Sequence, residues 1–368
     1  MKISNSFTTS TSTCPAKYQE VYRPAASALL SDISGVDGSG SGLDADTLDG
    51  HSSADFSSAS DLSTVTTRVS DLETETRDDH VIRVSVSGGD YSSLATAIAA
   101  ISDAAEDNPY LVIVGPGSFA VDSALTIPSG VHVRGAGMYA TTLEGSISAG
   151  SVASGCLLNL SSGASLSYLG IRNAATTNHA TAICASNISA SDTADPSTFT
   201  TFLDHVYLDV TGATGTGHYG LYATNADVLL RHSAVRVGNA TIDYGAYFSG
   251  SGSTKVARVE GTSFRIIGGN GNAILTSGST LTTYISGATI DTDGVGIYAS
   301  NSRIQFTHST LNGGGSYALY ANGASATIIV NQIQIDAALH AGTASGGTVT
   351  CSFVSELSSG VGHASTCS

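Results

Sequence analysis

Charged side chains are scarce in this 368-residue chain: they make up 12% of the residues, and only three of them are lysines. A helical bundle needs Leu, Glu, Lys and Arg in quantity, so the composition argues against that class. The formal net charge of −16 argues against a nucleic-acid partner, because neutralising phosphates requires clustered Lys and Arg. Tryptophan is absent, which weighs against a sugar-cleaving groove.

Long hydrophobic runs are also missing. No stretch approaches the length of a membrane span, and we expect no membrane insertion. The first residues, MKISNSFTTSTSTC, contain one lysine but lack the apolar segment of a secretory signal peptide.

Cysteines are few and widely scattered. There is no CxxC pair and no histidine at zinc spacing, so we expect no metal centre built on them. We expect most of them to be small buried hydrophobic residues, with a Cys351–Cys367 disulfide as an open alternative. The five cysteines are Cys14, Cys156, Cys184, Cys351 and Cys367.

Small residues dominate the remainder of the chain. Glycine alone accounts for 42 residues, and Ser, Thr and Ala are abundant, while hydrophobic residues still make up 41%. This mixture suits stacked strands joined by tight turns around a substantial core. We therefore predict an all-β fold.

The N-terminal part contains two segments of different character. Residues 1–35 hold an aromatic and basic patch, which we interpret as an attachment segment, and residues 36–60 begin with a flexible Gly-Ser run. Within 36–60, the sequence DTLDG at 46–50, followed by Phe56, resembles an element that recurs in the tail fibres of bacterial viruses.

Residues 61–79 show the spacing of a short coiled coil. Leu62, Val65, Val69 and Leu72 alternate at intervals of three and four residues between polar neighbours. Two heptads do not hold chains together unaided, but before a larger trimeric domain they could set its stoichiometry. The alternative is an isolated amphipathic helix that packs on its own chain.

The segment from 81 to 145 contains a strand at 81–86, an amphipathic helix from 94 to 105, and then the runs LVIVGPGSFAV and ALTIPSGVHVRGAG. This order resembles the N-terminal start of pectate-lyase-like proteins, whose fold is a right-handed parallel β-helix. The resemblance implies that the helix caps the open end of the solenoid, since a bare end would expose strand edges. We predict a β-helix over 80–345 and a C-terminal cap or tail over 346–368.

A short pattern of a small residue, an apolar residue and a tyrosine or its equivalent returns along the chain. Beyond 220 the intervals are 25, 28, 23, 22 and 20 residues, which is the length of one coil of a β-solenoid. The returns are Ala182-Ile183-Cys184, Gly220-Leu221-Tyr222, Gly245-Ala246-Tyr247, Ala273-Ile274-Leu275, Gly296-Ile297-Tyr298, Ala318-Leu319-Tyr320 and Ala338-Leu339-His340.

The strand after each return predicts three columns of residues stacked on successive coils. The first is Asp204, Arg231, Glu260, Ser286, Thr307, Asn331. Beside it lies His205, His232, Gly261, Gly287, His308, Gln332. The third is Arg172, Asp209, Arg236, Arg265, Asp291, Asn312, Asp336.

Most carboxylates that could be catalytic lie in these columns. Two acids flanking a glycosidic bond would make a hydrolase, but charges of opposite sign alternate in the first column and partly in the third. Stacked opposite charges attract, so we favour a charge ladder formed by Asp204, Arg231, Glu260, Asp209, Arg236 and Arg265.

Three acids remain as weak catalytic candidates. They are Asp243, near a turn, and the pair Asp291 and Asp293. We expect no cofactor; calcium at Asp291 and Asp293 is the alternative, although an Asp-x-Asp pair alone is a weak signal.

The last residue of each return faces outward if the apolar residue before it faces inward. The result is an exposed stripe, and a contiguous stripe of this kind is normally covered. A trimer interface is our first interpretation, and a platform on which sugar rings stack is the alternative. The stripe consists of Tyr222, Tyr247, Leu275, Tyr298, Tyr320 and His340.

The resemblance to β-helix tail fibres and tailspikes implies a homotrimer in a virion. Its N-terminus would bind other tail or baseplate proteins, and its β-helix would contact a glycan or protein of the host surface. Because one fold hosts many functions, three hypotheses stay open: a non-catalytic attachment fibre, a polysaccharide depolymerase and a prokaryotic cell-surface adhesin. We favour the first.

Overall fold

The structure is a computed structural model that describes residues 47–48, 51–52, 63, 65–68, 80–190, 199, 201–212, 214–268, 270–313, 317–335, 341–356 and 362–363. The chain divides into two units, Met1–Arg77 and Asp78–Ser368. Among the described residues no helix is long and apolar enough to cross a bilayer.

The first unit contains a short antiparallel pair. Strand β1 (Thr47–Leu48), within DTLDG, pairs with β2 (His51–Ser52), which follows it directly. Further along, Ser63 and residues 65–68 are helical, and Val65 is 52% exposed. Leu62, Val69 and Leu72 lie outside the described residues, so trimerisation by this segment stays a prediction.

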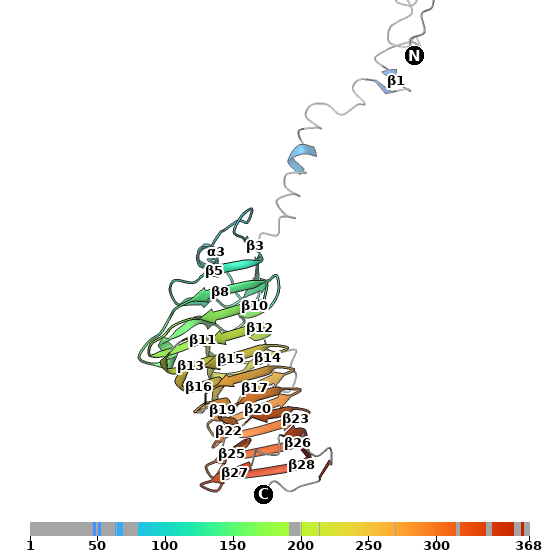
Figure 1. Ribbon diagram of the computed structural model, residues 1–368. Helices are drawn as coiled ribbons and strands as arrows, with labels where there is room; N and C mark the ends of the chain where they lie inside the picture. Colours follow the sequence, from blue (N-terminus) through green and yellow to red (C-terminus); the bar gives the residue numbers. More distant parts are fainter. Residues whose placement is uncertain are drawn as a thin grey trace, which may run out of the picture. The chain divides into compact units, whose positions relative to one another are not determined.

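The second unit is a right-handed parallel β-helix (Figure 1). Its first sheet contains β3 (Val81–Val84), β4 (Tyr110–Val114), β7 (Val131–Gly135), β14 (Val228–Arg231), β17 (Lys255–Glu260), β20 (Leu281–Ser286) and β23 (Arg303–Thr307). Its second sheet contains β5 (Gly117–Ala120), β8 (Thr141–Gly145), β15 (Ala234–Gly238), β18 (Ser263–Ile267), β21 (Thr289–Thr292) and β24 (Thr310–Gly313).

Four long strands run through both of these sheets: β10 (Ser165–Asn173), β12 (Phe202–Val210), β26 (Thr327–Ile335) and β28 (Thr348–Glu356). A third sheet consists of β6 (Leu125–Ile127), β9 (Cys156–Leu160), β11 (His179–Ile188), β13 (Gly215–Ala226), β16 (Ala240–Ser249), β19 (Asn272–Ser277), β22 (Val295–Ser300), β25 (Leu319–Asn322) and β27 (Ala341–Ala344). Within the three sheets every pairing is parallel, apart from the short β29 (Gly362–His363) against β28.

The core lies inside the coils and is built from aliphatic and aromatic columns. Alternate residues of each strand point inward, so apolar residues one coil apart stack along the axis. One such column on the first sheet is at most 1% exposed throughout. It consists of Leu166, Leu203, Leu230, Val259, Ile285, Phe306 and Val330.

The first and second sheets meet at a bend made by one residue in the left-handed region. Its φ lies between 47° and 62° on seven coils, which turns the chain and resets the inward–outward alternation. The bend residues are Tyr168, His205, His232, Gly261, Gly287, His308 and Gln332. Six of these form the second column of the sequence analysis.

Helix α3 (Leu94–Ala100) is shorter than the helix predicted over 94–105. Leu94, Ala97 and Ile98 pack into the core, as their spacing predicts. The helix stops because Ile101 is extended and Asp103 accepts hydrogen bonds from Asn108 and Tyr110, which hold a turn instead. At the other end, β28 adds a rung to the solenoid, which therefore extends to Glu356 and not only to 345.

The cysteines correct the sequence analysis. Cys156 and Cys184 are buried, but they form a disulfide between β9 and β11 and are not free thiols. They lie 28 positions apart, about one coil, so the solenoid brings them together. Cys351 is also disulfide-bonded. Cys367, its predicted partner, lies outside the described residues.

Candidate functional site

A column of charged residues crosses the second sheet. Strand register places Glu144 of β8, Arg172 of β10 and Asp209 of β12 side by side, followed by Arg236, Arg265, Asp291 and Asn312 on later coils. The Arg172 guanidinium contacts the Glu144 carboxylate at 3.1 Å, and Arg265 lies 3.9 Å from Asp291. Asp336, the last predicted member, lies outside the described residues.

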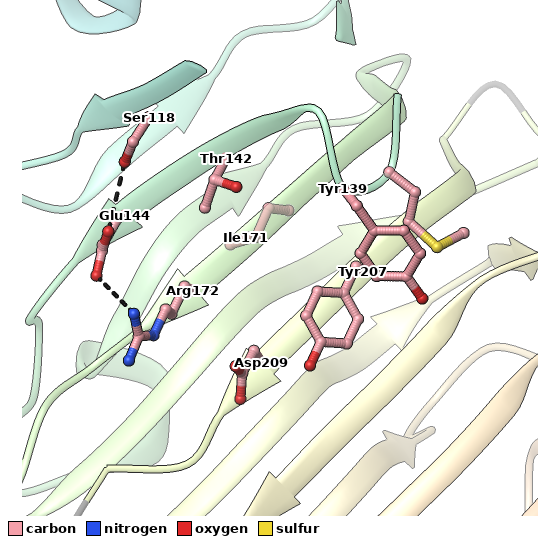
Figure 2. A pocket seen from close by; sticks show the side chains of 9 residues that line it. Ser118, Tyr139, Thr142, Glu144, Ile171, Arg172, Tyr207 and Asp209 are labelled. Atoms are coloured by element: carbon pink, nitrogen blue, oxygen red, sulfur yellow. Dashed lines mark hydrogen bonds and ion pairs between the residues drawn. The ribbon is translucent and has the colours of Figure 1, made fainter. Parts of the chain in front are cut away.

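An open pocket of about 260 Å³ lies at the β8–β12 end of this column. Figure 2 shows its lining, with Glu144 between Ser118 and Arg172 and two tyrosine rings across from them. Met138 and Tyr139 come from the loop between β7 and β8, and the strands supply the other residues. The lining consists of Ser118, Met138, Tyr139, Thr142, Glu144, Ile171, Arg172, Tyr207 and Asp209.

The two tyrosines give the pocket an aromatic side. The ring centroids of Tyr139 and Tyr207 are 5.2 Å apart with an interplanar angle of 54°. Tyr139 is 73% exposed, so its ring is available to a ligand. Tyr207 is half-buried, and burial raises the pKa of its phenol, with a smaller contribution from the nearby Asp209 carboxylate. The phenol therefore stays protonated at neutral pH and offers a hydrogen-bond donor.

The polar side of the pocket is held in place by hydrogen bonds. Glu144 accepts from Arg172 at 3.1 Å and from the Ser118 hydroxyl at 3.4 Å. Asp209 is nearly buried and accepts from the Thr211 hydroxyl at 2.8 Å. Arg172 lies on the strand between Glu144 and Asp209, whose backbones are two strand spacings apart, or about 9.6 Å. The pocket thus combines ring faces with fixed donors and acceptors, the chemistry that a sugar ring requires.

Sequence reasoning placed Arg172 and Asp209 in a column but missed Glu144, Tyr139 and Tyr207. Glu144 precedes the first recognisable repeat, and Tyr139 is on a loop that no repeat describes. Tyr207 could have been found, because it lies two positions before Asp209 and so shares its face.

The predicted ladder on the first sheet is in register. Asp204, Arg231 and Glu260 occupy the same position on β12, β14 and β17, and Arg231 lies 3.2 Å from Asp204. Burial opposes ionisation of Asp204, but hydrogen bonds from His232, Arg231 and His205 prevail and lower its pKa. An acid held in the charged form is a poor proton donor.

The three weak catalytic candidates do not form a site together. Asp291 is exposed and faces Arg265, and Asp293 accepts a hydrogen bond from the Gly268 amide at 3.1 Å. No third metal-ligating side chain joins them within the described part of the chain. Asp243 is 2% exposed and lies in register with the buried His218 on the preceding coil. A polysaccharide cannot reach it, so the structure argues against Asp243 as a catalytic residue.

The outward stripe lies on the third sheet. Tyr222, Tyr247, Leu275, Tyr298 and Tyr320 are in continuous register on β13 to β25. The rings of Tyr222 and Tyr247 stack at 5.0 Å, and those of Tyr298 and Tyr320 lie 5.2 Å apart.

The last predicted member of the stripe differs. Tyr320 pairs with Gly342, whereas His340 lies outside the described residues. A Cβ at Gly342 would come within 2.5 Å of Tyr317 and 2.8 Å of Tyr320, so these rings occupy the space. The stripe therefore ends at Tyr320, because the last coil is longer than the repeat indicates.

No protein-family profile matches the chain, and no curated protein matches it either. Solved structures that resemble it include a pectin methylesterase from Aspergillus niger, with a TM-score of 0.45, 15% identity and coverage of 76% of this chain and 87% of that one. A pectin methylesterase in complex with a hexasaccharide has a TM-score of 0.41 and 12% identity, with coverage of 77% of this chain and 92% of that one. ORF18 of Geobacillus virus E2 has a TM-score of 0.32 and 14% identity, with coverage of 82% of this chain and 65% of that one. At these identities the similarity concerns the β-helix fold alone.

Proposed function

We propose that this chain binds a surface polysaccharide through the pocket lined by Tyr139, Tyr207, Glu144, Arg172 and Asp209. The observation that supports it most is the pair of tyrosine rings, one of them 73% exposed, beside a fixed row of two carboxylates and a guanidinium. Rings of this kind cover the apolar face of a sugar, and the charged groups bind its hydroxyls. A cavity of about 260 Å³ accepts one sugar unit of a longer chain.

Binding without cleavage fits the positions of the carboxylates better than hydrolysis. The backbones of Glu144 and Asp209 are two strand spacings apart, or about 9.6 Å, with Arg172 on the strand between them, whereas a retaining mechanism needs two carboxyl groups about 5–5.5 Å apart. Arg172, on the strand between them, contacts the Glu144 carboxylate at 3.1 Å, so a guanidinium already occupies the position beside this acid.

We further propose that the binding serves attachment of a virion, with this chain as a homotrimeric tail fibre or spike. The DTLDG element and the seam at 61–79 support this assignment, as does an aromatic stripe in register on the third sheet. A cell-surface adhesin and a depolymerase are the competing assignments.

The test is a pair of tyrosine variants of the full chain on an array of microbial surface polysaccharides. Tyr139→Ala removes the exposed ring of the pocket, and affinity for the bound polysaccharide should fall about 2- to 12-fold, the value of one aromatic contact. Tyr317→Ala, at an exposed tyrosine beside the stripe, is the matched control and should leave affinity unchanged. Loss of binding in Tyr317→Ala, with binding retained in Tyr139→Ala, would mean that the glycan binds at the stripe and not in the pocket.

Cleavage is measured on the same polysaccharide as release of reducing ends. No release is expected. Release that both Glu144→Gln and Asp209→Asn abolish, with binding retained, would establish the depolymerase instead.

A further inference from the structure

Away from the pocket, three potential metal ligands converge where the first and second sheets meet. The Nδ1 atoms of His205 and His232 lie 2.9 Å and 3.2 Å from the same oxygen, Oδ1 of Asp204. One ligand atom from each residue lies within 4.8 Å of the others. The His205 and His232 side chains are 40% and 56% exposed, so a solute can reach the cluster, while Asp204 is 12% exposed.

The fold fixes this geometry. Asp204 is the residue before the bend in β12, and the two histidines are the bend residues of successive coils. The His205 ring stacks on Tyr168 at 4.8 Å and lies 5.0 Å from the His232 ring. Arg231 binds the other carboxylate oxygen of Asp204 at 3.2 Å, which directs Oδ1 toward the histidines.

We propose that Asp204, His205 and His232 form a binding site for a divalent first-row transition metal ion, with Zn²⁺ as the preferred ion. At metal–ligand distances of about 2.0–2.2 Å, neighbouring ligand atoms lie about 2.9–3.5 Å apart, which the observed 2.9 Å and 3.2 Å match. Two imidazoles and one carboxylate suit Zn²⁺, Co²⁺ or Ni²⁺, whereas Ca²⁺ takes oxygen ligands. Three protein ligands leave a coordination position open to water or a ligand.

The bend does not itself require these imidazoles, because it needs only a residue that adopts positive φ, and glycine serves on the next two coils as Gly261 and Gly287. Histidine is among the non-glycine residues that adopt this conformation most readily, and His308 does so on a later coil. His205 and His232 differ from His308 in that both contact one carboxylate oxygen, Oδ1 of Asp204. Gly261 also leaves the outer face of His232 open, because a Cβ there would lie 3.1 Å from the ring.

The site escaped the sequence analysis because its ligands follow no short motif. His205 and His232 are one coil apart, and Asp204 was assigned to the charge ladder with Arg231. The cluster would tie two coils together through the metal.

The experiment uses the full chain, purified without a polyhistidine tag and stripped with chelator. Zn²⁺ binding is measured by calorimetry, and Co²⁺ binding by its visible absorption, which reports nitrogen and oxygen ligands directly. We expect one equivalent per chain in wild type, and at least about tenfold weaker binding in His205→Gly and in His232→Gly. Glycine at these positions is compatible with the bend, so the variants should fold, which circular dichroism checks.

His308→Gly is the matched control, since His308 is a bend residue in the same column but follows Thr307, not an acid. It should bind like wild type. Absence of a saturable one-equivalent phase in wild type, unchanged affinity in both test variants, or equal weakening in His308→Gly would each overturn the proposal.

Discussion

His218 and Asp243 are buried neighbours on β13 and β16, 0% and 2% exposed. The His218 Nδ1–H donates to the Gly238 carbonyl at 2.7 Å, and Asp243 Oδ1 lies 3.5 Å from the same nitrogen. The distance allows an ion pair, but burial lowers the pKa of His218 and raises that of Asp243 to about 7. Both directions favour the neutral forms, an uncharged imidazole beside a carboxylic acid.

This pair predicts the pH dependence of stability. Asp243 binds its proton more tightly in the folded chain, so its contribution is complete below pH 3.8 and is lost as the pH rises to about 7. His218 contributes in the opposite sense, since its lowered pKa destabilises the fold as the pH falls below 6.5. Comparing Asp243→Asn with wild type cancels the contributions that the other titratable groups, present in both proteins, make to the pH dependence.

From pH 4 to pH 7 the unfolding free energy of Asp243→Asn should therefore rise relative to that of wild type, by up to about 4 kcal/mol. Above pH 7 the difference between the two should level off. The measurement is chemical unfolding of both proteins across this range. Asp122→Asn, at an exposed carboxylate, is the control and should show no such trend. A difference between Asp243→Asn and wild type that is constant with pH would mean that Asp243 is ionised in the fold.

At the scale of one element, the bend between the first and second sheets depends on backbone conformation. Gly287 has φ of +62°, and a Cβ built on it would have no neighbour closer than 3.5 Å. Gly287→Ala should therefore destabilise the fold by about 1 kcal/mol through the backbone alone. Thermal unfolding of the variant and of wild type measures this loss of stability. Gly150→Ala, where φ is not positive and no atom lies within 4 Å, should be neutral.

Gly245 represents a different constraint within the same solenoid. Its φ is not positive, but a Cβ there would lie 2.5 Å from the Ala273 carbonyl oxygen and 2.7 Å from the Phe264 ring. Gly245→Ala should cost about 1–3 kcal/mol, more than Gly287→Ala, because the packed core must shift. The same thermal assay ranks the two variants. The opposite order would show that coil packing adjusts more easily than the bend.

At the scale of the whole molecule, the aromatic stripe leads to a prediction of assembly. Tyr222, Tyr247, Tyr298 and Tyr320 are only half-buried in one chain, and a continuous ring surface of this kind is usually covered. Light scattering on the full chain should give about three times the mass of one 37.0 kDa chain. Tyr247→Ser with Tyr298→Ser should weaken this assembly, whereas Tyr139→Ser should not. A monomer or dimer mass for wild type would exclude the trimer.

Much of the solenoid could be predicted from the sequence because strand register is repetitive. Once each coil has about two dozen residues, Asp204, Arg231 and Glu260 must stack, and so must Tyr222 and Tyr247. Inward and outward faces follow from alternation, and the bend column follows from the position of His205 between two runs of apolar alternation.

The tertiary structure decided what repetition does not specify. The loop that brings Tyr139 to Tyr207 and the end of the stripe at Tyr320 depend on coil lengths that depart from the repeat. The disulfide of Cys156 joins two adjacent coils, which the scattered cysteines alone do not indicate. Register made His218 and Asp243 neighbours, but only the packed coils removed them from water and shifted both pKa values toward the neutral forms. The sequence by itself determined which residues share a column, since backbone pairing sets that. Which columns meet, and in what solvent environment, was decided by the path of the turns and the direction of the side chains.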